Sequence, residues 1–243
     1  MPKPRNLANR TKELELFLKM AVGDHDCRIM LIEGDSGMGK SSLLSRFRHQ
    51  CPSDIKCVPF DCKGVNSIPA FLSEVMFDLG REQFPTFTHK VKVFVQGGVD
   101  FSENDVTADT ISIAINSSVD LATQDYRLEQ LQEAFFRDLA KLQHRTVITL
   151  DTYQMASESL RGWIESKWLR TVRRHLENVV TVIAGQSVPD PNNSVWGDDC
   201  EHFSLTAIVD PKAWCEFCTD LPEEAIKAIA LGCKGWLTDK THD

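Results

Sequence analysis

Hydrophobic residues along the chain form short apolar runs that alternate with longer segments of helical periodicity. Five runs are rich in β-branched and other apolar residues and predict buried strands, over residues 28–33, 56–60, 147–151, 179–184 and 203–208. Apolar residues that recur every three or four positions predict helices over residues 11–22, 68–79, 126–142 and 157–175, and another helix through Leu43, Leu44 and Phe47. Strands that alternate with helices are typical of an α/β fold, with a mostly parallel sheet covered by helices on both faces.

Residues 82–124 interrupt this alternation. Two runs there, 91–95 and 111–115, place Val or Ile at every second position and flank a polar stretch that contains Gly97 and Gly98. Strict alternation is typical of half-buried strands. The segment therefore predicts an insertion that is a hairpin or a partly disordered excursion.

Composition and charge narrow the class of protein. Hydrophobic residues make up 42% of the 243 residues and charged residues 26%, which excludes a disordered chain. No stretch reaches the ~18–20 apolar residues of a membrane helix, and the N-terminus lacks the apolar core of a signal peptide, so we expect a cytoplasmic protein with no membrane partner. The net charge of −8 argues against a general nucleic-acid binder, because attraction to phosphates needs a basic surface.

The eight cysteines fit reduced, partly buried thiols in such a compartment. The pair Cys215 and Cys218 has the spacing of a redox or metal-binding CxxC, but it follows a helix-opening Asp210-Pro211 rather than a strand. Structural, metal-binding and redox roles stay open for this pair.

The strand predicted at residues 28–33 runs directly into the sequence GDSGMGKSS, which begins at Gly34 and matches the phosphate-binding pattern G-x-x-x-x-G-K-[ST]. Its glycines allow the sharp turns that aim backbone N–H groups at phosphate oxygens, and the following helix adds its positive N-terminal end. Lys40 would place a cation on the β- and γ-phosphates, and the Ser41 hydroxyl would enter the shell of a Mg²⁺ ion. The residues expected to contact the nucleotide, ATP or ADP, are Gly34, Asp35, Ser36, Gly37, Met38, Gly39, Lys40, Ser41 and Ser42.

The second half of such a site is expected at an acid that ends a strand. Asp151 closes the apolar run 147–150 and can hold the magnesium ion through a water molecule. The metal ligands predicted from the sequence are therefore Ser41 and Asp151. As an alternative, an Asp at this position can cap the helix that follows.

These motifs resemble the nucleotide-binding core of the STAND-type P-loop ATPases, which are relatives of the AAA+ and origin-recognition ATPases. Besides the phosphate-binding loop (Walker A), residues 150–154 (LDTYQ) resemble the family's Walker B strand and residues 182–186 (VIAGQ) its sensor strand. Residues 7–14 (LANRTKEL) are similar to the family's N-terminal GRxxEL motif near the adenine, which implies that Asn9 and Arg10 contact the nucleotide. Residues 226–235 (IKAIALGCKG) resemble the start of its helical lid. The resemblance implies a three-layer P-loop NTPase core over residues 1–208, which includes the insertion, and a short, incomplete helical lid over residues 209–243.

Two catalytic positions depart from the family pattern. Members often carry an acid at the position of Gln154 and an arginine at the position of Gln186, the sensor residue, whereas glutamine can neither take a proton nor carry charge. Residues 187–202 contain no Arg or Lys where relatives often place an arginine finger, which can contribute ~10³–10⁵ in rate. We therefore expect weak or absent ATP hydrolysis at a site whose catalytic positions are Asp151, Gln154 and Gln186. The alternatives are that Glu158, Glu165 or a partner's side chain supplies the missing chemistry, or that Gln154 is a substitution that traps the nucleotide.

The resemblance implies a nucleotide-dependent switch or assembly module, in signalling or bacterial antiviral defence, that acts on a protein partner or on further copies of itself. Two alternatives stay open: an active AAA+-type ATPase of DNA transactions, of the loader or transposition type, and an interaction module with a relic P-loop. A basic patch at Arg170, Arg173 and Arg174 is either a solvated helix face or a docking surface for an acidic partner.

Overall fold

Five parallel strands form the central sheet of the computed structural model, which describes residues 10–64, 66–95, 106–117, 120–208, 222 and 224–228. The strands are β1 (Ile29–Glu33), β2 (Lys56–Asp61), β3 (Thr146–Asp151), β4 (Val179–Gly185) and β5 (Cys200–Ser204). Their order across the sheet is β2-β3-β4-β1-β5, and every neighbouring pair is parallel. The apolar runs predicted all five, although β5 begins three residues earlier than expected.

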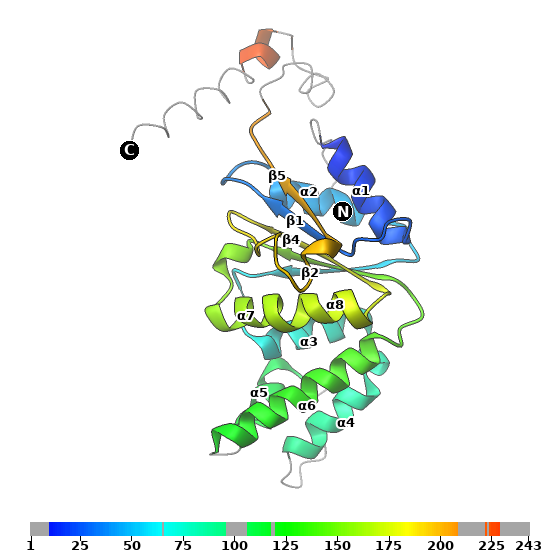
Figure 1. Ribbon diagram of the computed structural model, residues 1–243, viewed down its shortest axis with the longest axis vertical. Coiled ribbons are helices and arrows are strands. Elements are labelled where there is room, and N and C mark those ends of the chain that lie inside the picture. Colours follow the sequence, from blue (N-terminus) through cyan, green and yellow to red (C-terminus); the bar gives the residue numbers. More distant parts are fainter. Residues whose placement is uncertain are drawn as a thin grey trace, which may run out of the picture.

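Helices cover both faces of this sheet, so the predicted three-layer α/β architecture is confirmed (Figure 1). One face carries α1 (Thr11–Val22) and α2 (Lys40–Gln50). The other face carries α3 (Ile68–Leu79), α7 (Glu158–Trp163) and α8 (Leu169–His175), and a π-helical segment at Ile164–Trp168 joins α7 to α8. The helix predicted over residues 157–175 therefore forms with a π-helical interruption.

Alternate residues of each strand belong to two separate hydrophobic cores. In β1, Ile29 and Leu31 pack on the α3 side of the sheet, whereas Met30 and Ile32 pack on the side of α1 and α2. A strand that is buried on both faces carries a continuous apolar run rather than an alternating one. This is why the sequence predicts the central strands β1, β3 and β4 well.

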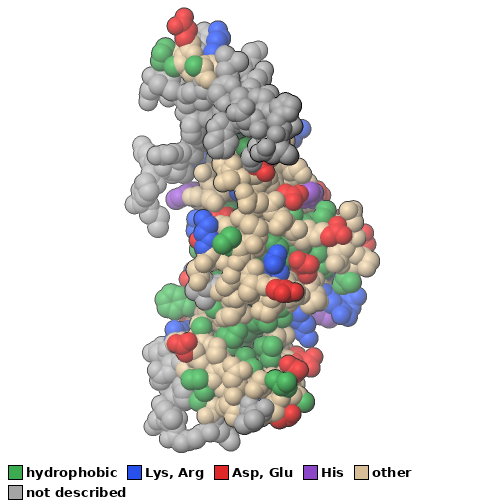
Figure 2. Space-filling view, turned by 90° about the vertical axis from the view of Figure 1, so that its left-hand side faces the viewer, with side chains coloured by type: hydrophobic (Ala, Val, Ile, Leu, Met, Phe, Trp, Pro, Cys, Tyr) green, Lys and Arg blue, Asp and Glu red, His purple; other side chains and the backbone are tan. Residues whose placement is uncertain are grey.

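The insertion at residues 82–124 is helical where the structure describes it, and the predicted hairpin is wrong. It contains α4 (Pro85–Val95), α5 (Ala108–Asn116) and the first residues of α6 (Leu121–Leu139), while residues 96–105 and 118–119 lie outside the described ranges. These helices extend from the α3 side of the sheet, at the end of the molecule opposite α1 (Figure 1). Figure 2 shows hydrophobic side chains gathered on the lower part of one face, at the level of these helices. The helix predicted from residue 126 thus begins earlier, at Leu121, and ends earlier, at Leu139.

The alternating Val and Ile residues of the insertion lie on different sides of their helices. Val91 and Ile111 are fully buried, but Val93 and Ile113 are 38% and 52% exposed. Phe87, four residues before Val91, packs edge-to-face on an aromatic ring of α6 with the ring centroids 5.5 Å apart. Because a spacing of four residues returns to the same side of a helix, Phe87 and Val91 form the buried stripe of α4.

Little of the expected helical lid is described. Residues 224–228 are helical, and apart from Pro222 the rest of residues 209–243, including Cys215 and Cys218, lies outside the described ranges. In the part of the chain that is described, no helix combines the length and apolar character needed to cross a bilayer.

Asp138 of α6 caps the N-terminus of α4 across the insertion. Its side chain is almost fully buried, and Oδ2 accepts a hydrogen bond of 2.9 Å from the backbone N–H of Phe87. The Asp138→Ala change leaves this N–H without its acceptor, so we expect a loss of about 1–3 kcal/mol in the free energy of unfolding, measured by urea denaturation. The control Asp125→Ala removes an exposed carboxylate of the same helix and is expected to change stability by less than ~0.5 kcal/mol. Equal stability of the two variants would contradict the capping role.

Candidate nucleotide-binding site

The phosphate-binding loop connects β1 to α2 at the carboxyl end of the sheet, as the sequence predicts. Gly37 and Gly39 adopt φ values of +83° and +84°, which side chains with a Cβ rarely tolerate. A Cβ atom added at either position would meet nothing within 4 Å. Both glycines therefore border open space, where a bound group has room to approach the backbone.

Gly34, by contrast, is tightly enclosed. Its N–H donates a 3.2 Å hydrogen bond to the carbonyl of Gly185 at the end of β4. An added Cβ would lie 2.8 Å from the carbonyl oxygen of Leu205, and Leu205 itself is held by a 2.7 Å hydrogen bond from its N–H to the carbonyl of Glu33. The base of the loop is therefore fixed between the end of β4 and the segment that follows β5.

Lys40 is the first residue of α2, and its side chain folds back over the loop. Nζ donates hydrogen bonds to the carbonyl oxygens of Gly34 (2.6 Å) and Asp35 (2.7 Å). Burial lowers the pKa of Lys40, and the nearby carboxylates of Asp151 and Asp35 oppose this effect. The ammonium group is thus held at the loop, within the field of the acid that ends β3.

Asp151 and Ser41 are the predicted magnesium ligands. Asp151 is half-buried, and its Oδ1 accepts a 2.8 Å hydrogen bond from the N–H of Thr152, a residue in the left-handed region at φ +57°. Ser41 is exposed in the first turn of α2. A carboxylate and a hydroxyl are oxygen donors of the kind that Mg²⁺ prefers, so this donor set fits the ion.

The structure brings the two glutamines of the predicted catalytic set together. Oε1 of Gln154 accepts a 2.9 Å hydrogen bond from the backbone N–H of Gln186, just after β4, while the Gln186 side chain is exposed. Gly185 makes this approach possible, because a Cβ there would lie 3.0 Å from the same Oε1 and 2.4 Å from the carbonyl oxygen of Ser187. The Gln154 amide thus fastens the turn after β3 to the end of β4.

Neighbouring side chains hold the turn that carries Gln154. The hydroxyl of Tyr153 is buried and donates a 2.9 Å hydrogen bond to Oε1 of Glu165. Burial raises the pKa of Tyr153, and Glu165 raises it further. Asn66 reaches the other end of the turn, where its Nδ2 donates to the carbonyl of Met155 (2.5 Å) and its backbone carbonyl accepts from the hydroxyl of Ser157 (2.8 Å). Glu165, one of the acids considered as a substitute base, is thereby engaged by Tyr153.

Asp61 is a carboxylate of this edge that the sequence analysis missed. It ends β2 and lies directly opposite Asp151 in the parallel register of β2 and β3. Oδ1 of Asp61 accepts a 3.0 Å hydrogen bond from the N–H of Lys63. The charge of Asp61 acts on Glu74 of α3, whereas the charge of Asp151 acts on Lys40. An acid at the end of each apolar run was the available signal, but the sequence alone does not show that the two strands are adjacent.

Of the two N-terminal residues expected near the adenine, the structure describes Arg10 but not Asn9. Arg10 donates a 2.9 Å hydrogen bond from Nη2 to the carbonyl of Thr206, and its Nη1 lies 3.5 Å from Oε1 of Glu13. Thr206 directly follows Leu205, so Arg10 lies beside the segment that encloses Gly34.

The basic patch predicted on α8 is divided. Arg173 is not free, because its guanidinium lies 3.5 Å from carboxylate oxygens of Asp198 and Asp199 in the connection to β5. Arg170 and Arg174 are exposed. Arg173 is therefore not part of a freely solvated face, whereas the exposure of Arg170 and Arg174 fits both a solvated face and a docking surface.

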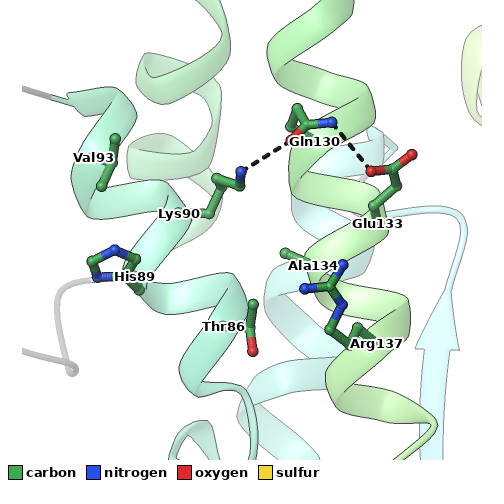
Figure 3. Close-up of a pocket in the computed structure, with 8 residues that line it drawn as sticks. All are labelled: Thr86, His89, Lys90, Val93, Gln130, Glu133, Ala134 and Arg137. Carbon is green, nitrogen blue, oxygen red and sulfur yellow. Dashed lines mark hydrogen bonds between the residues drawn. The ribbon is translucent and has the colours of Figure 1, made fainter.

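A separate hollow of about 320 Å³ lies between α4 and α6 (Figure 3). Lys90 donates a 3.0 Å hydrogen bond across it to Gln130, and Gln130 donates one of 3.1 Å to Glu133. The hollow lies on the insertion, at the end of the molecule away from α2 (Figure 1), and takes no part in the loop geometry.

The strand–loop–helix geometry, together with an acid at the end of a parallel strand in the same sheet, defines a P-loop NTPase fold. Residues 6–180, most of the chain, match the family model described as AAA ATPase domain, and the protein belongs to this family. No curated protein is significantly similar to the chain in sequence.

One solved structure shares the fold, and two others show weaker similarity. Cdc6p of Pyrobaculum aerophilum aligns with a TM-score of 0.56 at 14% identity, over 95% of this chain and 56% of that one. The Walker-type ATPase of Pyrococcus abyssi aligns with a TM-score of 0.49 at 16% identity, over 94% of this chain and 65% of that one. The Orc1 protein of Aeropyrum pernix, solved in complex with DNA, aligns with a TM-score of 0.45 at 15% identity, over 90% and 51%. The chain thus spans between about half and two thirds of these proteins.

Gly34→Ala tests the enclosure of the loop base. The new Cβ would lie 2.8 Å from a backbone oxygen, so the segment after β5 has to move, and we expect a loss of about 1–3 kcal/mol in stability. Thermal denaturation measures this as a lower Tm. The control Gly64→Ala adds a Cβ that meets nothing within 4 Å, and its Tm is expected to equal or slightly exceed that of the parent. If both variants have the same Tm, the enclosure of Gly34 does not contribute to stability.

Proposed function

We propose that the chain binds ATP together with Mg²⁺ and acts as a nucleotide-dependent switch or assembly module that hydrolyses ATP slowly. The contact between Gln154 and Gln186 carries this proposal. At the position of the expected catalytic acid stands an amide, and its oxygen already accepts a backbone N–H. Membership of the AAA ATPase domain family supports the nucleotide-binding part.

The open side of the phosphate-binding loop supports triphosphate binding. We place the phosphates against residues 34–42, where Gly37 and Gly39 border open space and the N-terminal end of α2 supplies partial positive charge. On binding, Lys40 exchanges its bonds with the carbonyls of Gly34 and Asp35 for phosphate oxygens. Ser41 is the proposed direct ligand of Mg²⁺, and Asp151 holds the ion through water. Bound Mg²⁺ would supply charge neutralisation at the β- and γ-phosphates.

Slow hydrolysis follows from the groups around the attacking water. A glutamine can orient a water molecule by hydrogen bonding but cannot accept its proton. Glu165 is engaged by Tyr153, and residues 187–202 contain no Arg or Lys to stabilise the transition state. A general base contributes ~10²–10⁴ in rate, and its loss fits a protein that holds the nucleotide rather than consuming it quickly.

The backbone around Gly34 supports a switch. Leu205 and Thr206, which lead from β5 toward residues 209–243, contact Gly34 and Arg10 respectively. A change in charge at the phosphates therefore acts on the loop base and, through it, on this segment. Signalling or bacterial defence, with a protein partner or further copies of the chain, is the proposed setting and rests on the resemblance to STAND-type ATPases.

A DNA-directed ATPase is the second candidate, and exposed arginines on α8 are the observation that favours it. Arg170 and Arg174, exposed on α8, are cations that could meet phosphates. The net charge of −8 opposes it. Binding of a fluorescent DNA duplex, with and without ATP, separates the two functions: saturable binding that weakens with salt favours the DNA-directed ATPase.

Lys40→Ala is expected to weaken binding of a fluorescent ATP analogue by at least about 100-fold, because a cation that is held at the loop is lost. Titration by fluorescence anisotropy in the presence of Mg²⁺ measures the change. The matched control Lys56→Ala removes an exposed lysine of β2, far from the loop in sequence and sheet order, and should bind like the parent. Undiminished binding by Lys40→Ala would support the interaction module with a relic P-loop.

Gln154→Glu is expected to raise the rate of phosphate release about 100-fold or more. A glutamate in the same place can accept the Gln186 N–H with one oxygen and take a proton with the other. The control Gln154→Met has similar length but neither accepts nor takes a proton, and should keep the slow rate. Steady-state phosphate release with ATP and Mg²⁺ gives all three rates.

The Asp61→Asn variant identifies the competing base. If the parent chain releases several phosphates per second and Asp61→Asn abolishes this release, hydrolysis is fast and Asp61 serves as base, so slow turnover is refuted. If the parent is slow and Asp61→Asn leaves its rate unchanged, Asp61 is not the base, and the rate of Gln154→Glu decides whether the amide accounts for the slow turnover.

A further inference from the structure

Three side chains with metal-binding atoms meet at the amino end of the sheet, away from the phosphate-binding loop. His25 and Cys27 lie in the connection from α1 to β1, and Glu201 lies near the start of β5, the strand that pairs with β1. Nε2 of His25 lies 3.7 Å from Oε1 of Glu201, and Sγ of Cys27 lies 4.0 Å from the same oxygen. The three ligand atoms all lie within 4.8 Å of one another.

We propose that His25, Cys27 and Glu201 bind a divalent transition-metal ion, Zn²⁺ above all, at the junction of β1 and β5. Imidazole nitrogen, thiolate sulfur and carboxylate oxygen are the donors that Zn²⁺ accepts, at about 2.0–2.3 Å each. Donors at these distances around a tetrahedral ion are about 3.3–3.8 Å apart. The observed 3.7 and 4.0 Å separations therefore approach two edges of such a tetrahedron, the third pair lies within 4.8 Å, and water can complete the fourth position.

The surroundings of the three side chains favour a cation. The carboxylates of Glu201, Asp199 and Asp26 lie near the Cys27 thiol, and Arg28 is the cation that opposes them. All three ligand side chains are half-buried, so an ion can enter from solvent while the ligands keep their positions. The cluster thus differs from a surface group of acids, because it adds a nitrogen and a sulfur donor in contact with one carboxylate.

Metal binding requires the His25 ring to move its proton from one nitrogen to the other. In the metal-free arrangement its Nδ1 accepts a 3.1 Å hydrogen bond from the backbone N–H of Cys27, so Nε2 carries the proton of the neutral ring and faces Glu201. Coordination through Nε2 transfers that proton to Nδ1 and breaks the bond to the Cys27 N–H. The thiol of Cys27 gives up its proton to become the ligand, so one proton is released per ion bound.

The ion would join the connection after α1 to the edge strand of the sheet. In the described residues β5 pairs with β1 alone, and its carboxyl end leads to Leu205 against Gly34. A metal at the amino end of β5 therefore fixes the strand at the end opposite the phosphate-binding loop. This site is independent of the nucleotide proposal, since none of its ligands belongs to that loop.

The test uses the full, untagged chain, freed of metal by a chelator and kept without nucleotide. Because Cys215 and Cys218 form another pair of thiols, the titration is made in the Cys215→Ser/Cys218→Ser background. With Co²⁺ as probe we expect one ion per chain, a thiolate-to-cobalt charge-transfer band in the near ultraviolet, and competition by Zn²⁺. In ¹H–¹⁵N spectra, Zn²⁺ should shift the Cys27 amide and the His25 ring nitrogens.

Cys27→Ser is expected to remove the charge-transfer band, while Cys51→Ser, at a half-buried cysteine elsewhere, keeps it. His25→Ala and Glu201→Gln are each expected to weaken Co²⁺ binding at least about tenfold, a loss that even outer-shell changes produce. Circular dichroism checks that each variant folds, and if Cys27→Ser does not fold, the His25→Ala titration decides. The proposal is overturned if no ion binds, or if the Cys27→Ser and His25→Ala variants that fold bind Co²⁺ as the background does.

Discussion

The close approach of Leu205 to Gly34 is the constraint on which the rest of the site depends. The N–H of Gly34 bonds to the end of β4, and the carbonyl oxygen of Leu205 lies 2.8 Å from the position that a Cβ atom of residue 34 would occupy. Because only glycine leaves room for this contact, β1 stays paired with β4 on one side and with β5 on the other up to the residue where the loop begins. The residues from Gly37 onward are then free to turn their backbone toward open space.

This constraint also connects parts of the chain that are distant in sequence. Arg10, at the start of α1, bonds to Thr206, which is the residue after Leu205. The start of α1, the base of the loop and the segment leaving β5 therefore share one corner of the molecule. A loop that binds phosphates at this corner has direct contact with the segments on both sides of it, which supports the proposed switch without any rearrangement of the sheet.

The sequence predicted those parts of the structure that depend on residues close together in the chain. The strands follow from apolar runs that are buried on both faces, and the loop follows from its glycines between a strand and a helix. The insertion was misread because Val91 and Val93 alternate like strand residues, although Phe87 and Val91 also have the spacing of a helix. Starting signals such as Pro85 and the Thr107 capping box favoured helices there.

The sequence did not predict which residues meet across neighbouring strands and loops. That Asp61 lies beside Asp151, and that Arg173 pairs with Asp199, depends on the order of strands and on loops that cross the sheet edge. The individual residues carried no signal of these neighbours. Sequence analysis could therefore name Gln154 and Gln186 as altered positions, but only the structure shows that the side chain of one holds the backbone of the other.

The hydrogen bond to Gln186 explains the shape of the turn at Gln154 but does not by itself explain an amide, because a carboxylate accepts an N–H equally well. The difference between the two is charge. Asp61 and Asp151 already end neighbouring strands at this edge, opposite each other in the register, and a glutamate at position 154 would add a third carboxylate near a bound nucleotide. A further negative charge at this edge weakens the binding of an anion, whereas a base there speeds hydrolysis. A neutral acceptor keeps the hydrogen bond, favours retention of the triphosphate and gives up the proton acceptor, which is the combination that a long-lived nucleotide-bound state requires.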